Sequence, residues 1–121
     1  GTLSKLEFPY GVSACEKSGI PGRFQWDYPN AWAPVQFIVV EALLKCGYTD
    51  DAKRVAEKYI MTVDRCFEET GRLWEKYNAV EGSIRVISEK TEQMPVMLGW
   101  TAGVYLWFQN RIRAANGKGM K

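Results

Sequence analysis

The sequence predicts an all-α unit of about three helices joined by long loops. Three observations support this prediction: an apolar run over Val35–Leu44 that follows a proline, a three-and-four spacing of apolar residues over Ala52–Phe67, and a second apolar cluster over Val104–Ile112. The 121 residues suit one globular unit, so we treat residues 1–121 as a single domain.

Composition excludes several classes of function. Sixteen basic and fourteen acidic residues leave a net charge of +2, which gives no positive field for nucleic acid. No run approaches the roughly 18–20 apolar residues of a membrane span, so we expect no membrane contact. The chain has no histidine, and we expect no metal site. Any acid–base chemistry must therefore fall to carboxylates, tyrosines or lysines.

The cysteines indicate a reducing compartment. Cys15, Cys46 and Cys66 are odd in number and far apart, which argues against a disulfide framework and for free thiols. We therefore expect a cytoplasmic protein.

The first 33 residues predict a loop that lies across a scaffold, because prolines and glycines interrupt them repeatedly. Pro34 suits the first turn of a helix, which we expect over about 34–46, ending at Gly47 and buried on most sides. A second, amphipathic helix begins after a cap at Thr49 or Asp50 and ends at Gly71. A short extended segment follows over 72–78.

The remaining chain predicts one more helix. Residues 84–87 suit either a short strand or a loop, and Pro95 blocks any helix through it. A third helix is expected over about 100–113, mostly covered, with a frayed tail after Ala115. Functional-looking residues thus stand just ahead of the buried helices, as at the rim of a helical barrel.

Three ordered segments are similar to those of one enzyme family. Residues 25–34 (QWDYPNAWAP) match in full the pattern QWDxPx(G/A/V)W(P/A/S)P of the α,α-trehalases. Residues 73–78 (LWEKYN) resemble the family's EKY segment, and residues 99–104 (GWTAGV) resemble its GWTNGV segment. With FPYGVS at 8–13, the resemblance runs from about residue 6 to residue 108.

This resemblance implies a fold and an activity. It implies a C-terminal portion of a twelve-helix (α/α)6 toroid, inverting hydrolysis of α,α-trehalose to two glucose molecules, and no cofactor. By position, Glu75 is identified as the catalytic base, and Gln25, Trp26 and Asp27 as sugar contacts with Asn30 in support.

Each of these residues also has an ordinary structural interpretation. A glutamate in a short extended segment is usually a solvated charge, and a tryptophan such as Trp26 is often a core aromatic. Asp27 suits the cap of a turn ahead of a proline, Asn30 suits the cap of the following helix, and Trp32 suits packing.

The sequence also departs from the family pattern. Inverting hydrolysis needs a second carboxyl group about 6.5–9.5 Å from the base, and the family segment that bears this general acid has no counterpart here. The family's glycine-rich lid is missing between Asn78 and Gly99, where Glu92 falls near the place of the lid glutamate.

We therefore expect the isolated chain to be inactive, and to self-associate or to need the rest of the barrel. Three other interpretations stay open: a related (α/α)6 α-glucosidase acting on another glucoside, an inactive sugar-binding module, and a helical domain with a coincidental match.

Overall fold

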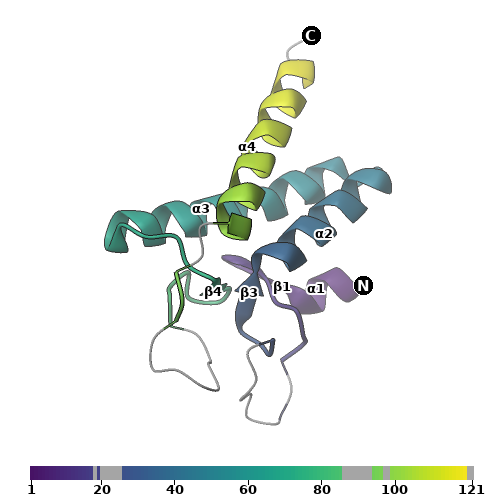
Figure 1. Ribbon diagram of the computed structural model, residues 1–121. Coiled ribbons are helices and arrows are strands. Elements are labelled where there is room, and N and C mark those ends of the chain that lie inside the picture. Colours follow the sequence, from purple (N-terminus) through teal and green to yellow (C-terminus); the bar gives the residue numbers. More distant parts are fainter. Residues whose placement is uncertain (18, 20–25, 86–93, 97–98, 120–121) are drawn as a thin grey trace.

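Three long helices dominate the computed structural model, which describes residues 1–17, 19, 26–85, 94–96 and 99–119 (Figure 1). The elements are α1 (Thr2–Leu6), β1 (Glu7–Phe8), β2 (Gly11–Val12), β3 (Asn30–Trp32), α2 (Ala33–Lys45), α3 (Thr49–Thr70), β4 (Lys76–Asn78) and α4 (Gly99–Gly119). The all-α prediction is confirmed.

Helix α2 follows β3 without a connecting loop. Trp32 is its extended N-cap residue and Pro34 lies in its first turn, where a missing N–H costs nothing. The observed bounds differ by one residue from the predicted 34–46. The expected burial was wrong, however, because Ala33, Gln36 and Val40 are buried whereas Ile38 is 64% exposed. The described residues cover one side of α2.

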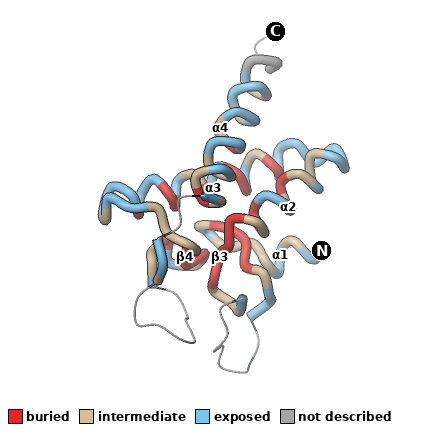
Figure 2. The backbone as a smooth tube through the Cα atoms, viewed as in Figure 1, coloured by how far each residue is buried: buried red, intermediate tan, exposed pale blue. Residues whose placement is uncertain are grey.

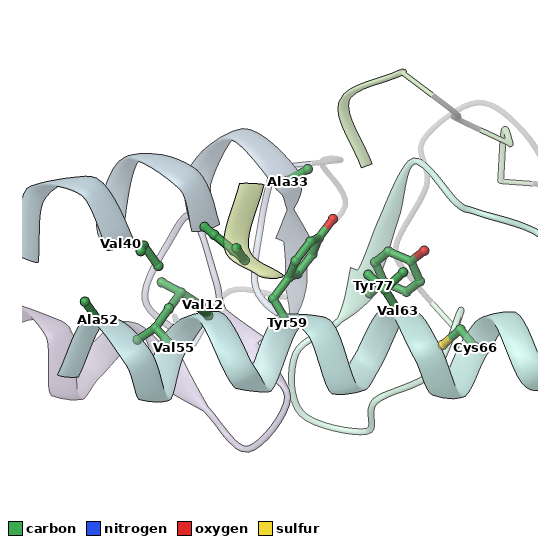
Figure 3. Packing of buried hydrophobic residues seen from close by; sticks show 11 residues of the cluster. Val12, Ala33, Val40, Ala52, Val55, Tyr59, Val63, Cys66 and Tyr77 are labelled. Carbon is green, nitrogen blue, oxygen red and sulfur yellow. The ribbon is translucent and has the colours of Figure 1, made fainter. Parts of the chain in front are cut away.

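Helix α3 follows the predicted amphipathic pattern. Its buried face points toward α2, β2 and β4 (Figure 3) and consists of Ala52, Val55, Ala56, Tyr59, Thr62, Val63 and Cys66. Gly71 ends the helix in the left-handed conformation, and its N–H donates to the carbonyl of Phe67 at 2.7 Å. The expected cap was wrong, because the N-cap residue is Tyr48 and Thr49 is already helical.

Tyr59 connects the elements that surround the core. Its ring lies edge-on to Tyr77 of β4 at 6.0 Å and edge-on to Phe108 of α4 at 5.9 Å between centroids. Such aromatic pairs add about 0.5–1.5 kcal/mol each to the burial of their area. One residue of α3 therefore fixes both β4 and the first half of α4.

Helix α4 is longer and less covered than predicted. It begins at Gly99 and continues to Gly119, past the expected end at 113 and through the tail expected to fray. Its second half projects beyond α2 and α3 (Figure 1) and is largely exposed where its side chains are described (Figure 2). Leu106 is 57% exposed and Trp107 42% exposed, so the expected cover of this helix was also wrong for this chain.

The first 33 residues contain short regular elements that the loop prediction overlooked. Strands β1 and β2 pair antiparallel, with Glu7 opposite Val12. Gln36 of α2 holds this hairpin, because its Oε1 accepts from the N–H of Val12 at 2.8 Å and its Nε2 donates to the carbonyl of Val12 at 2.6 Å. Within the described residues, no helix combines the length and the apolar composition that crossing a bilayer requires.

An ion cluster ties the N-terminal segment to α3. The carboxylate of Glu7 accepts from Nε and Nη2 of Arg54, both at 2.8 Å, and from Nζ of Lys58. The hydrogen bonds from Arg54, reinforced by Lys58 and opposed by burial, lower the pKa of Glu7 to about 2. Because this pKa is lower in the folded chain, the cluster stabilises the fold fully above pH 4.5.

We predict that Glu7→Gln lowers the free energy of unfolding by about 1–2 kcal/mol at pH 7, a value reduced for partial exposure of the pair. In the unsubstituted chain this contribution is lost as the pH falls from 4.5 through about 2, so the difference between the two proteins should be smaller at pH 2.5 than at pH 7. Urea unfolding at pH 7 and pH 2.5 measures both quantities. Glu57→Gln is the control, since Glu57 is 53% exposed and forms only a 3.9 Å pair with Lys53; an equal loss in both variants would contradict the prediction.

Candidate active site

Strand pairing brings two of the three motif segments together. β3 and β4 are antiparallel, with Asn30 opposite Asn78, Ala31 opposite Tyr77 and Trp32 opposite Lys76. Segments far apart in the chain therefore lie side by side. Glu75 immediately precedes Lys76, the residue of β4 that lies opposite Trp32.

Glu75 is held in place by its own backbone and by its neighbours. Its N–H donates to the carbonyl of Pro95 at 3.1 Å, and Trp74 forms an antiparallel bridge with Val96. Its side chain is 17% exposed, and Oε2 accepts a charge-assisted hydrogen bond from Nζ of Lys76 at 2.8 Å. Glu75 is thus an ordered, half-buried carboxylate and not the freely solvated charge of the ordinary interpretation.

Lys76 links this carboxylate to the signature segment. Its side chain is 2% exposed, and Nζ lies 4.8 Å from the centroid of the Trp32 ring. A desolvated cation over an indole face gains up to about 2 kcal/mol. Trp26 in turn stacks on Trp32, with centroids 4.1 Å apart and planes inclined by 14°. The four side chains form a continuous row from Trp26 to Glu75.

The remaining signature residues divide between the predicted roles. Gln25 lies outside the described residues. Trp26 is 40% exposed, so the core interpretation is wrong for it, whereas Trp32 is 2% exposed and packs as expected. Asp27 accepts at its carbonyl from the N–H of Asn30 at 2.9 Å, closing a turn that contains the cis peptide bond before Pro29. Asn30 is fully buried in β3 and does not cap α2, so the capping interpretation is wrong.

The third motif positions the site through its threonine. Thr101 is fully buried, and its Oγ1 donates to the carbonyl of Trp74 at 2.7 Å. The preceding Trp100 lies edge-on to Trp32, with centroids 5.6 Å apart and planes at 90°. The roles of Thr101 and Trp100 were not expected from the sequence, although a threonine in the first turn of a largely apolar helix was an available signal.

The turn after β4 is built from polar and glycine contacts. Oδ1 of Asn78 accepts from the N–H groups of Val80 and Glu81 at 2.9 and 3.0 Å, and its Nδ2 donates to the carbonyl of Arg85 at 2.8 Å. Gly82 adopts φ +66°, and a Cβ there would lie 2.5 Å from the Tyr10 ring. Glu92, predicted near the lid position, lies outside the described residues.

Tyr77 serves the site by packing and not by proton transfer. Its hydroxyl accepts from the N–H of Trp74 at 3.1 Å, and burial raises the pKa of Tyr77 to about 12. The phenol therefore stays neutral near pH 7. Among the described residues, no three carboxylates or thiols gather where they would hold a metal ion. Glu75 contributes the carboxylate of the row that it forms with Trp26, Trp32 and Lys76.

Comparison with known proteins gives a consistent result. The family model described as Trehalase matches residues 2–113. A trehalase from Tenebrio molitor is 40% identical over 92 residues, covering 73% of this chain and 16% of that protein, and one from Bombyx mori is 35% identical over 113 residues, covering 90% and 19%.

A solved structure agrees with these sequences. Neutral trehalase Nth1 from Saccharomyces cerevisiae matches with a TM-score of 0.71 and 31% identity, over 96% of this chain and 21% of that one. The predicted fold, a helical fragment of an (α/α)6 toroid, is thereby confirmed. The chain spans about a fifth or less of the length of these relatives.

We predict that Thr101→Val loosens the segment that carries Glu75. Loss of one buried hydrogen bond, with the Trp74 carbonyl left unsatisfied, should lower the free energy of unfolding by about 1–2 kcal/mol. Exchange of the Glu75 amide hydrogen, which the Pro95 carbonyl protects, should become faster. Urea unfolding and hydrogen exchange measure these effects, with the exposed Thr49→Val as control; unchanged exchange at Glu75 would show that Thr101 does not hold this segment.

Proposed function

This chain belongs to the trehalase family, and we propose that the protein containing it is an inverting glycoside hydrolase that converts α,α-trehalose to two glucose molecules. We propose Glu75 as its general base. The observation that carries the proposal is the row of Trp26, Trp32, Lys76 and Glu75, in which an exposed indole and an ordered carboxylate come from two motif segments joined by strand pairing.

The chemistry assigns one role to each group. Glu75 removes a proton from the water that attacks the anomeric carbon, on the face opposite the leaving sugar. Oε2 of Glu75 accepts a charge-assisted hydrogen bond from Nζ of Lys76 at 2.8 Å. Trp26 offers the flat apolar surface on which sugar rings stack, and Asp27, Gln25 and Asn30 are proposed to hydrogen-bond glucose hydroxyls or to support those contacts.

The general acid is proposed to come from another part of the barrel. Inversion requires a carboxylic acid about 6.5–9.5 Å from the base, and the family segment that bears it has no counterpart in these 121 residues. We therefore propose that the isolated chain does not hydrolyse trehalose. A cytoplasmic location is also proposed, supported by Cys15, Cys46 and Cys66 as free thiols.

We predict that Glu75→Gln, made in the longest natural polypeptide that contains this chain, lowers kcat for trehalose at least about 10³-fold while substrate binding persists. Loss of the base removes proton transfer from water, and the amide keeps the shape of the carboxylate. Glucose release measures kcat, and calorimetry measures binding.

Glu41→Gln provides the matched control. Glu41 is 19% exposed, against 17% for Glu75, and it also accepts from a cation, Arg111 at 3.1 Å. The control should keep nearly full activity. Proton NMR of the first products should give equal amounts of α- and β-glucose. Full activity of Glu75→Gln would contradict the role of this residue, and turnover of other glucosides in place of trehalose would favour the related α-glucosidase.

We predict that the isolated chain self-associates through the uncovered faces of α2 and α4. Four apolar side chains on these faces are 36–64% exposed: Phe37, Ile38, Leu106 and Trp107. The ring centroids of Phe37 and Trp107 are 6.0 Å apart. Light scattering should show a mass that rises with concentration, and Ile38→Glu with Leu106→Glu should reduce it. A monomer at every concentration would contradict this prediction.

A further inference from the structure

We propose that Lys76 is a positioning residue for Glu75: its ammonium, seated between the Trp32 ring and the Glu75 carboxylate, fixes the orientation of that carboxylate. This inference deepens the proposed base role of Glu75 and rests on it. It assigns Lys76 no contact with the substrate.

The burial of Lys76 is the first argument. Lysine is almost never fully buried without a partner, because removing an ammonium from water costs several kcal/mol. Lys76 is 2% exposed, and its Nζ has Oε2 of Glu75 at 2.8 Å and the Trp32 ring at 4.8 Å. Each of the two contacts offsets desolvation, so movement of Nζ away from Glu75 would leave a buried charge without its anion.

The rigidity of the surroundings is the second argument. Lys76 lies in β4 directly opposite Trp32 in the strand register, which keeps its stem against the indole. Trp32 is fixed in turn by Trp26 stacked on it and by Trp100 edge-on to it. The ammonium can therefore move little, and the Glu75 carboxylate that accepts its hydrogen bond is held in one orientation. A base must be placed to within fractions of an ångström to be effective.

A second cation–indole–carboxylate set in the same chain supplies an internal comparison. The Arg111 guanidinium lies 4.9 Å from the Trp107 ring and 3.1 Å from Oε2 of Glu41. Arg111 is 46% exposed, so solvent screens that set and replaces any contact that is lost. The buried set at Glu75 has no such replacement, and its removal should have consequences that removal of the exposed set lacks.

Removal of the Lys76 ammonium should lower kcat and leave KM nearly unchanged. The carboxylate loses a donor at 2.8 Å and samples several orientations, which lowers kcat. Because the Lys76 side chain is 2% exposed and is assigned no contact with the sugar, KM should change little.

The experiment compares Lys76→Met, Lys76→Arg and the control Arg111→Met, in the longest natural polypeptide that contains this chain. For Lys76→Met we expect kcat to fall about 10–100-fold with KM nearly unchanged. Lys76→Arg keeps a cationic donor with a different geometry, so kcat should fall less than in Lys76→Met. Arg111→Met should leave kcat and KM unchanged.

The outcomes separate this inference from the proposed function. Unchanged kcat in Lys76→Met, or a rise in KM as large as the fall in kcat, would overturn the positioning role even if Glu75→Gln abolishes hydrolysis. Crystal structures of the parent and of Lys76→Met give a second readout that needs no activity: a carboxylate that leaves its position supports the inference, and an unchanged carboxylate overturns it. If the parent protein does not hydrolyse trehalose, the proposed function fails, and these structures still decide the inference. If Lys76→Met does not fold, Lys76→Arg takes its place in both measurements, and an unchanged kcat with an unchanged carboxylate overturns the inference.

Discussion

The site depends on one short antiparallel pairing, that of Asn30–Trp32 with Lys76–Asn78. Each strand has only three residues, yet each continues into an element that the core holds: β3 into α2, and β4 into the turn organised by Asn78. The register determines which side chains meet, because a slip of one residue in either strand would move Lys76 away from the Trp32 ring. Tyr59 of α3 stabilises the pairing by packing its ring edge-on against Tyr77 of β4.

The polar groups of the site are kept in place by contacts that involve no substrate. Thr101 holds the carbonyl of Trp74, Pro95 accepts from the amide of Glu75, and Lys76 donates to its carboxylate. Preorganisation of this kind is what general base catalysis requires, since a group already oriented loses little entropy in the transition state. The third motif thus acts through the backbone of the second.

Helices α2 and α4 have apolar faces that the described residues leave exposed. Helix α3 buries its apolar stripe within these 121 residues, whereas α2 and α4 keep Ile38, Leu106 and Trp107 exposed. The matched trehalases are between four and five times as long as this chain. In a toroid of paired helices each helix is covered on several sides by others, so exposed apolar faces are expected of a segment with this share of the length.

The three long helices and the glycine stop at Gly71 could be predicted from the sequence, because periodicity and helix-ending residues are local properties. Glu75 and Trp26 became site candidates through the resemblance of their segments to trehalase motifs. The β3–β4 register, the position of Lys76 over Trp32 and the hydrogen bond from Thr101 to Trp74 could not be predicted, since these contacts join residues far apart in the chain. Burial was also misjudged for Ile38 and Leu106, which are exposed. Apolar composition indicates that a helix face needs a partner, but its burial depends on which elements pack against it.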